Sequence, residues 1–504
     1  MLAVELNRAN FEYDVHSIVK AFYPEEQVSV LTPEMGEEKR ADLAQWVRIR
    51  ILLRDNGALV AVDGEEYDWK HTEGHTGGKP EAGAAVGEPP EKAYKYGFKC
   101  FLYRVLSRVT GRELPWGNLT GIRPTKIAFS LLEQGREKAE LVKHYMEKYY
   151  VSREKAELAV EIAGRELELL KGISHGKTGG ERGYSLYVGI PFCPTTCLYC
   201  SFTSFPIGAY RGMTDSYLDC LIREMEYVAE RYRERILDSV YIGGGTPTTL
   251  EAWQLDRLLG RLRELFDFSA VKEFTVEAGR ADSITEEKLQ ALQRHGVTRI
   301  SINPQTMKQQ TLDFIGRKAT VEQVETAYAL ARRMGFDNIN MDLILGLPGE
   351  SEADVQATMD RVVEMAPDSL TVHSLAVKRA SRLNQMVQEI GTHMLRNTDE
   401  TMRIAEEGAR RLGLVPYYLY RQKNMSGNFE NVGYAKEGKL GLYNILIMEE
   451  RQTIIALGAG SISKLVLPDG RIERSENVKE VNLYIEKIGE MIARKERLFQ
   501  LEEN

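Results

Sequence analysis

Three of the five cysteines in this 504-residue sequence lie within eight residues of one another. Cys193, Cys197 and Cys200 follow the pattern Cys-x3-Cys-x2-Cys, so one compact loop could turn three thiolates inward. They could be buried free thiols, or three ligands of a zinc ion whose fourth ligand comes from elsewhere. None of the eight histidines lies close in the sequence, which disfavours zinc. A conventional iron–sulfur cluster takes four cysteines, so three would leave one iron open to a small molecule.

A glycine-rich segment, Gly243-Gly-Gly-Thr-Pro-Thr248, directly follows a predicted strand at Asp238–Ile242. It is neither a P-loop nor a dinucleotide-binding fingerprint, because no Gly-x-Gly-x-x-Gly and no Lys-Ser/Thr follow. Three glycines would let backbone N–H and C=O groups approach a ligand with no Cβ in the way. A tight turn from strand to helix explains the same residues equally well.

Single polar residues lie at the ends of further predicted strands. Glu277 ends Phe-Thr-Val-Glu, Gln305 follows Arg-Ile-Ser-Ile-Asn-Pro, and Arg317 comes later on the same crossover. Each could be a helix cap, an exposed rim residue or a hydrogen-bonded core group. Asp342 lies within an apolar strand, where a carboxylate is costly unless it pairs or binds something.

The elements that must position these residues begin at Tyr184, where short β-branched runs alternate with amphipathic stretches. The six predicted strands are Ser185–Ile190, Asp238–Ile242, Glu273–Glu277, Arg299–Asn303, Asn338–Leu345 and Ser369–His373. Six β/α units predict a parallel sheet, either an open doubly wound sheet or a barrel. Ligands bind at the carboxyl ends of such strands, where the cysteines, the glycines, Glu277 and Gln305 all fall. We therefore expect these features to converge on one site.

The remaining chain divides by composition into an N-terminal α+β accessory domain at 1–172, a linker at 173–183, the barrel at 184–377 and a small C-terminal α+β portion at 378–504, which we expect to cover the substrate. The stretch 71–90, rich in Gly, Pro and Glu, is predicted to be a flexible excursion. Predicted N-terminal strands are Val28–Leu31, Val47–Leu53 and Leu59–Val62. The C-terminal portion is predicted to contain strands at Val415–Tyr420, Leu442–Met448 and Thr453–Leu457, and helices at Asp399–Arg411 and Lys479–Lys495.

The composition excludes several classes of protein. The 66 basic and 74 acidic side chains give a net charge of −8, which argues against a protein that coats nucleic acid. No apolar run is long enough for a transmembrane helix, and the N-terminus lacks the apolar region of a signal peptide. Few cysteines, odd in number, indicate a reducing cytoplasm and no disulfide framework.

Taken together, the motifs resemble those of the radical S-adenosylmethionine superfamily, and within it the oxygen-independent coproporphyrinogen III oxidase group. The matching residues run from Tyr187-x-x-Ile-Pro-Phe-Cys193 through the cysteines, the glycine segment, Val276-Glu277-Ala278 and Asp342-Leu-Ile-x-Gly-Leu-Pro-Gly349. Leu119-Thr-Gly-Ile-Arg-Pro-Thr-Lys126 and Lys378-Arg-Ala-Ser-Arg-Leu383 look most like the HemZ branch of that group.

The resemblance implies a partial (β/α)6 barrel that holds a [4Fe–4S] cluster on Cys193, Cys197 and Cys200. The open iron would chelate S-adenosylmethionine (SAM), whose reductive cleavage yields a 5′-deoxyadenosyl radical. By motif position, one SAM molecule would contact Tyr187, Gly244, Glu277 and Ile462, with the Glu277 carboxylate suited to the amino group. The oxidase group is also known for a second SAM, whose contacts would be Tyr199, Gly245, Thr246, Gln305, Arg317, Asp342 and Ala376.

The implied reaction is oxidative decarboxylation of two propionates of coproporphyrinogen III to vinyl groups, giving protoporphyrinogen IX in haem biosynthesis. It implies anaerobic conditions and a flavodoxin- or ferredoxin-like electron donor. A substrate with four carboxylates needs cations, which basic residues just past the barrel strands could supply unless they form a solvated basic face. These residues are Lys378, Arg379, Arg382 and Arg421.

The sequence departs from the oxidase pattern at two places. Gly189 stands where the group usually has His, and Ser201-Phe202 replaces the Gly-Cys that follows the cluster motif in the best-defined oxidases. The His-Asn-x-x-Tyr-Trp signature of the haem-chaperone relatives is missing as well. A haem-trafficking chaperone and a different radical enzyme, such as a methyltransferase that opens the haem ring, are therefore alternative predictions.

Overall fold

The computed structural model of the chain describes residues 1–70, 90–173, 183–378, 381–390, 395–422, 425 and 429–503. The predicted excursion at 71–90 and linker at 173–183 lie almost entirely outside these residues. The chain forms two compact units, residues 1–164 with 420–430 (unit 1) and residues 165–419 with 431–504 (unit 2). Within the described residues, no helix is long and apolar enough to cross a membrane.

Unit 1 contains a five-stranded sheet with helices packed on it. Its strands are β1 (Leu2–Leu6), β2 (Val28–Leu31), β3 (Val47–Arg54), β4 (Gly57–Val62) and β5 (Glu65–Lys70), in the order β2-β1-β3-β4-β5. Its helices are α1 (Glu12–Phe22), α2 (Glu37–Ala44), α3 (Pro90–Thr110), α4 (Thr125–Glu133), α5 (Lys138–Tyr149) and α6 (Arg153–Lys171), and the division between the units falls within α6. The three predicted N-terminal strands are confirmed as β2, β3 and β4, whereas the sequence patterns do not predict β1 or α1.

The segment 420–430 joins unit 1 through a buried carboxylate. Glu430 is fully buried and accepts a hydrogen bond of 2.7 Å from Trp116 Nε1. Its other oxygen lies 2.8 Å from Lys155 Nζ, and Lys155 is also buried. Because a buried charge needs a partner, this ion pair fixes the returning segment against the N-terminal helices of its unit.

Unit 2 is built on an eleven-stranded sheet in the order β14-β15-β13-β12-β11-β10-β9-β6-β16-β17-β18. Its strands are β6 (Gly183–Ile190), β9 (Ile236–Gly244), β10 (Glu273–Glu277), β11 (Arg299–Ser301), β12 (Ile339–Leu345), β13 (Ser369–Ser374), β14 (Val415–Tyr420), β15 (Asn431–Ala435), β16 (Thr453–Leu457), β17 (Ile462–Val466) and β18 (Ile472–Glu476). The short strands β7 (Phe192–Cys193) and β8 (Phe205–Pro206) pair separately. The neighbours from β13 to β16 are all parallel.

The six predicted β/α units are confirmed, and the strand order settles how they wind. The parallel strands from β6 to β13 follow the order of the chain, so each crossover runs in the same direction, as in a barrel and not as in a doubly wound sheet. The sheet continues past both ends of this series, into β15 on one side and β16 on the other.

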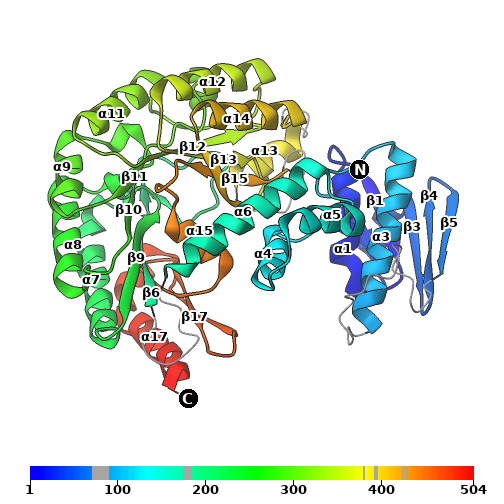
Figure 1. The fold of residues 1–504 in the computed structure, drawn as a ribbon, viewed down its shortest axis with the longest axis horizontal. Coiled ribbons are helices and arrows are strands. Elements are labelled where there is room, and N and C mark those ends of the chain that lie inside the picture. The colour runs from blue at the N-terminus through cyan, green and yellow to red at the C-terminus, as the bar shows by residue number, and fades with distance from the viewer. Residues whose placement is uncertain are drawn as a thin grey trace. The chain divides into compact units, whose positions relative to one another are not determined.

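Helices cover the outer side of this curved sheet (Figure 1). They are α7 (Thr214–Arg231), α8 (Ala252–Leu265), α9 (Glu286–Arg294), α11 (Val321–Arg333) and α12 (Glu352–Met365). Thr285, Thr320 and Ser351 each accept a hydrogen bond from the third amide of the helix that follows, which explains where α9, α11 and α12 begin. The other helices are α10 (Gln309–Phe314), α13 (Arg382–Ile390), α14 (Asp399–Arg411), α15 (Leu442–Glu449), α16 (Val481–Glu486) and α17 (Ile488–Glu503).

The predicted strand at Leu442–Met448 is wrong, because these residues form the helix α15. A short, continuous apolar run fits a buried strand and a buried helix equally well. The carboxylate of Glu273 decides between them, since it accepts hydrogen bonds from the amides of Leu442 and Tyr443 at the helix start. The predicted helix at Lys479–Lys495 is divided at Lys487 into α16 and α17.

Candidate functional site

The loop Cys193–Cys200, here called the cysteine loop, follows β6 at the carboxyl edge of the unit 2 sheet. It is tied to the loop after α10, because Leu198 N donates to Ile315 O at 2.9 Å and Thr195 Oγ1 donates to Gly316 O at 2.9 Å. These bonds fix the backbone from which the thiols project.

Each of the three thiols lies beside at least one polar side chain. Cys193 Sγ is 3.5 Å from Thr246 Oγ1, Cys200 Sγ is 3.7 Å from Ser204 Oγ, and Cys197 Sγ accepts from Arg280 Nη1 at 3.7 Å. Burial raises the pKa of the Cys193 thiol to about 11. Metal binding must therefore displace protons from this loop, while the neighbouring donors stabilise the thiolates that form.

The glycine segment pairs closely with the backbone around the cysteine loop. Gly245 N donates to Ile190 O at 2.8 Å, and Thr246 N donates to Phe192 O at 2.7 Å. A Cβ on Gly245 would lie 2.4 Å from Phe192 O, and one on Gly244 would lie 3.0 Å from Tyr187 Oη. Gly244 also has a φ of +107°, which favours glycine. The glycines thus let the β9 turn approach the cysteine loop, as expected for a tight turn that borders a site.

Glu277 of β10 and Tyr187 of β6 lie on strands that flank β9 on its two sides. The Glu277 carboxylate is partly buried at the end of β10, and burial raises its pKa to about 7. The Tyr187 ring is parallel to the ring of Tyr241, with centroids 6.2 Å apart. Tyr241 donates a hydrogen bond to Glu277, so β6, β9 and β10 present one connected set of side chains.

Gln305 occupies strained backbone next to β12. Its φ is +69°, uncommon for a residue other than glycine, and strain of this kind concentrates at functional sites. Two hydrogen bonds impose the conformation, from Gln305 N to Asp342 O and from Ile344 N to Gln305 O, both 2.9 Å. Gln305 Oε1 is buried with no hydrogen-bond partner in the described structure, and so is Arg317 Nε. Unpartnered buried polar atoms are rare and mark places that a ligand can complete.

Asp342, the carboxylate within an apolar strand, is paired. Asn303 Nδ2 and Asn340 Nδ2 donate to its two oxygens at 2.8 and 2.7 Å, and His373 Nε2 lies 3.8 Å away. Burial alone would raise the pKa of Asp342, but hydrogen bonding to His373 and Asn340 holds it below its usual value. Its charge is therefore accommodated within the protein, whether or not it also contacts a ligand.

The four basic residues predicted to bind the substrate differ in their surroundings and contacts. Lys378 Nζ lies 5.1 Å from the ring centre of Phe202, just after the cysteine loop. Arg382 donates to Thr196 O at 2.5 Å and so stabilises that loop directly. Arg421 belongs to unit 1, where it is buried and donates to Leu119 O at 2.6 Å. Arg379 lies outside the described residues.

Of the other predicted contacts, Ile462 begins β17 and is 44% exposed, and Tyr199 and Ala376 are partly buried. Sequence reasoning missed Arg280, Asn303 and Tyr241. Asn303 could have been found, because it lies in the same strand-end segment as Gln305. Arg280 and Tyr241 carry no comparable signal, since only the folded chain brings them to Cys197 and Glu277.

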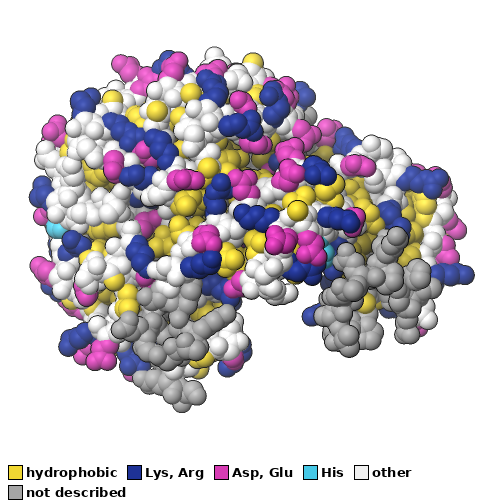
Figure 2. All heavy atoms as spheres, viewed as in Figure 1, with side chains coloured by type: hydrophobic (Ala, Val, Ile, Leu, Met, Phe, Trp, Pro, Cys, Tyr) yellow, Lys and Arg dark blue, Asp and Glu magenta, His cyan; other side chains and the backbone are white. Residues whose placement is uncertain are grey.

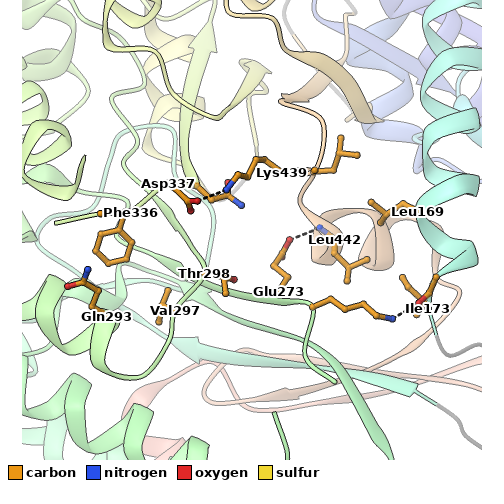
Figure 3. Close-up of a pocket in the computed structure, with 16 residues that line it drawn as sticks. Leu169, Ile173, Glu273, Gln293, Val297, Thr298, Phe336, Asp337, Lys439 and Leu442 are labelled. Carbon is orange, nitrogen blue, oxygen red and sulfur yellow. Dashed lines mark hydrogen bonds and ion pairs between the residues drawn. The ribbon is translucent and has the colours of Figure 1, made fainter. Parts of the chain in front are cut away.

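A cavity of about 590 Å³ lies at the opposite end of the strands (Figure 3). Its lining includes Glu273, the first residue of β10, and Asn338, directly before β12. Its charged groups already have protein partners, since Asp337 pairs with Lys439 at 2.9 Å and Glu273 caps α15. None of the residues predicted to bind the cluster, SAM or the substrate is among the residues that line this cavity.

Comparisons with known proteins identify the family to which the chain belongs. Residues 187–362 match the family model described as "Radical SAM superfamily". The oxygen-independent coproporphyrinogen-III oxidase-like protein HemZ of Bacillus subtilis is 37% identical over 484 residues, which are 94% of this chain and 92% of that protein. The chain belongs to this coproporphyrinogen oxidase-like family of radical SAM proteins.

Two further members of the family are similar over shorter stretches. The heme chaperone HemW of Bacillus subtilis is 34% identical over 211 residues, which are 42% of this chain and 55% of that protein. The structure of coproporphyrinogen III oxidase (HemN) from Escherichia coli aligns with a TM-score of 0.50 and 23% identity, over 65% of this chain and 78% of that one. This structural likeness supports the radical SAM fold of unit 2.

Radical SAM proteins bind a [4Fe–4S] cluster and SAM, and the described residues fit both groups. Among them, no three His, Cys, Asp or Glu side chains converge on a single ion. A cluster places its cysteine sulfurs on separate irons, so the three thiols need not meet at one point. Arg317 directly follows the Ile315–Gly316 segment that is hydrogen-bonded to the cysteine loop, whereas Gln305 is hydrogen-bonded to β12. Each keeps one buried polar atom without a hydrogen-bond partner among the described residues, which a polar ligand could complete. Cys193, Cys197 and Cys200 would hold the cluster, which leaves one iron open to SAM.

Replacing Gly245 with alanine is expected to loosen this site. The added Cβ meets two backbone carbonyls, so the β9 turn must move away from the cysteine loop at a cost of about 1–3 kcal/mol. We expect a lower thermal midpoint and partial loss of iron after reconstitution, measured by calorimetry and iron analysis. Gly489→Ala is the matched control, because a Cβ there meets nothing within 4 Å. Equal behaviour of the two variants would contradict the close approach.

Proposed function

We propose that this chain is an oxygen-independent coproporphyrinogen III dehydrogenase of haem biosynthesis, which converts two propionates to vinyl groups and gives protoporphyrinogen IX. The similarity to the HemZ protein named an oxygen-independent coproporphyrinogen-III oxidase-like protein carries the proposal, because it extends over 94% of the chain and includes both units. The cysteine loop, with three thiols and no fourth cysteine nearby, supports radical chemistry in this role.

The proposed reaction balances as follows for each propionate. When bound, the cluster and SAM supply a carbon-centred radical that can remove a hydrogen atom, after one electron arrives from a flavodoxin- or ferredoxin-like donor. Removal of a β-hydrogen leaves a carbon radical on the side chain. Loss of CO2 and of one electron then completes the C=C bond, and that electron passes to an external one-electron acceptor. The chain's own residues orient the groups and exclude water, which prevents side reactions.

The substrate's carboxylates need cations close to the cysteine loop. Lys378 is the described residue best placed for this role, since it follows β13 and lies beside Phe202. We also propose that Arg379, the next residue, binds a carboxylate of the substrate. Arg382 already donates to Thr196 O, so its first role is to stabilise the cysteine loop. Its remaining N–H groups can still donate to a carboxylate of the substrate. Arg421 lies in unit 1 and already donates to Leu119 O.

The experiment that tests the proposal is an anaerobic assay of the reconstituted protein with coproporphyrinogen III, SAM, reduced flavodoxin as the electron donor and oxidised flavodoxin as the one-electron acceptor. We expect CO2, 5′-deoxyadenosine and protoporphyrinogen IX, with two molecules of CO2 for each product molecule. Omission of SAM is the control and should abolish all three products. Deoxyadenosine without CO2 would contradict the proposed substrate while leaving the radical chemistry intact.

A haem chaperone is the second candidate. The chain is 34% identical to the heme chaperone HemW of Bacillus subtilis, and Ser201-Phe202 replaces the Gly-Cys expected after the cluster motif of the oxidases. Stable binding of haem, transfer to an apoprotein and no turnover of coproporphyrinogen III would favour this candidate over the first.

A further inference from the structure

Three tyrosine rings stack inside unit 2, close to the carboxyl edge of the sheet. The ring centres of Tyr187 of β6 and Tyr443 of α15 are 6.2 Å apart, and Tyr241 of β9 packs against both rings. Its ring centre is 6.2 Å from that of Tyr187 and 4.5 Å from that of Tyr443, with interplanar angles of 14° and 22°. Stacked aromatic pairs stabilise one another beyond the area they bury, so each ring restricts the next.

The Tyr443 ring of this group is fixed by α15. The amides of Leu442 and Tyr443 donate to the two oxygens of Glu273, at 2.6 and 3.3 Å. A carboxylate at a helix N-terminus interacts favourably with the helix dipole, so the start of α15 is held at the base of β10. Tyr443 is only 5% exposed and cannot turn away from Tyr241 into solvent.

The Tyr241 hydroxyl is directed at Glu277. Tyr241 Oη donates a hydrogen bond to Glu277 Oε1. A Cβ on Gly243 would lie 2.8 Å from both Tyr241 Cε1 and Glu277 Cδ, so the pair packs directly against a bare stretch of backbone. The tyrosine hydroxyl and the carboxylate therefore have a defined geometry before any ligand arrives.

The charges around Glu277 make this hydrogen bond important. Burial raises the pKa of Glu277 to about 7, and the nearby Asp342 carboxylate raises it further, whereas hydrogen bonds from Tyr241 and the Gly244 amide lower it. Burial also raises the pKa values of Tyr187, Tyr241 and Tyr443, so these neighbours stay neutral near pH 7. Among the described residues, Asp342 acts on this carboxylate, and Asp342 and Arg299 both act on its partner Tyr241. A hydrogen bond to the ionised form thus decides how much carboxylate is present at neutral pH.

We infer that Tyr241 is a positioning residue for SAM, whose hydroxyl holds the Glu277 carboxylate in its ionised form and aims it at the amino group of the ligand. The stack with Tyr187 and Tyr443 keeps the Tyr241 ring in the orientation that this requires. The inference concerns the cofactor site and does not depend on which porphyrin is the substrate.

Tyr241→Phe tests the inference, because it removes the hydroxyl and keeps the ring. We measure SAM binding to the reconstituted protein by anaerobic calorimetry between pH 6.5 and 9. The loss of a charge-assisted hydrogen bond should weaken binding by about tenfold near pH 7. Without the hydroxyl the pKa of Glu277 rises, so less carboxylate is present at pH 7 and more is regained as the pH increases. The ratio of wild-type to variant affinity should therefore shrink toward pH 9, and the ligand's own titration cancels in this ratio.

Two comparisons separate positioning from a structural effect. In a Glu277→Gln background, Tyr241→Phe should cause no further loss, because the group it acts on is gone. Tyr232→Phe is the matched control, since Tyr232 also donates to a carboxylate, Glu502 Oε2 at 3.3 Å, on helix α17. An affinity ratio that is constant across pH, or an equal loss in the Gln background, would overturn the inference. These outcomes are distinct from failure of the proposed function, which concerns turnover of the porphyrinogen.

Discussion

Replacement of Cys193 by alanine is expected to abolish cluster assembly and all reductive cleavage of SAM. Two thiols cannot hold a cluster that already has one iron without a protein ligand, so the visible absorbance should fall below about a tenth of the wild-type value. The change deletes only a partly buried sulfur at the end of β7, so the fold should survive. Anaerobic reconstitution followed by iron and sulfide analysis measures the effect, and far-UV circular dichroism checks the fold.

The chain provides matched controls in its two other cysteines. Cys220 is buried on α7 and contacts Ile485 O at 3.7 Å, and Cys100 is buried in unit 1, where Asn118 Nδ2 donates to its sulfur at 3.1 Å. Alanine at either position should leave iron content and SAM cleavage unchanged. Iron at full stoichiometry in Cys193→Ala would refute the assignment of Cys193 as a cluster ligand. Iron loss in Cys220→Ala would show that the iron content reflects damage to the fold and not loss of a ligand.

The parallel part of the fold and the place of the site could be predicted because both depend on local patterns. Strands buried on both faces form continuous β-branched runs, and the polar residues that follow them meet at the carboxyl edge. Accordingly, Cys193 contacts Thr246, which follows β9, and Cys197 contacts Arg280, which follows β10. Basic and acidic side chains are interspersed on the face that Figure 2 shows, as expected from their similar numbers of 66 and 74.

The remaining features depend on contacts between distant residues. The sequence of α15 cannot show that Glu273, 169 residues earlier, will cap it and so place Tyr443 in the stack. Arg421 follows a predicted strand and so looks like another cation at the sheet edge. The chain instead enters unit 1 at this point, where the Arg421 guanidinium donates to the Leu119 carbonyl.

Replacement of Lys495 by methionine is expected to cause the largest loss of stability in unit 2. Lys495 Nζ lies 2.5 Å from Glu224 Oε1, and both side chains are at most 1% exposed. Removal of one partner leaves a buried carboxylate without a counter-ion, which costs about 3–5 kcal/mol. Hydrogen exchange of peptides from α7 and α17 measures the loss, and peptides from unit 1 serve as the internal reference.

The expected consequence extends to the site, because Glu224 also holds the loop before β17. Glu224 Oε2 accepts from Gly458 N at 2.9 Å, and the next amide, Ala459 N, donates to Tyr217 Oη at 3.0 Å. Tyr217 in turn donates to Gly189 O at 2.7 Å, four residues before Cys193. Lys495→Met should therefore weaken SAM binding as well as stability.

A second substitution separates the charge from the packing of this buried pair. Adding Glu224→Gln to Lys495→Met removes the unpaired charge and should restore part of the stability, because the amide can still hydrogen-bond to Tyr484 and Gly458. Recovery of stability without recovery of SAM affinity would mean that the Glu224 carboxylate itself orders the loop. Additive losses in the double variant would contradict a coupled pair, because coupled charges deviate from additivity.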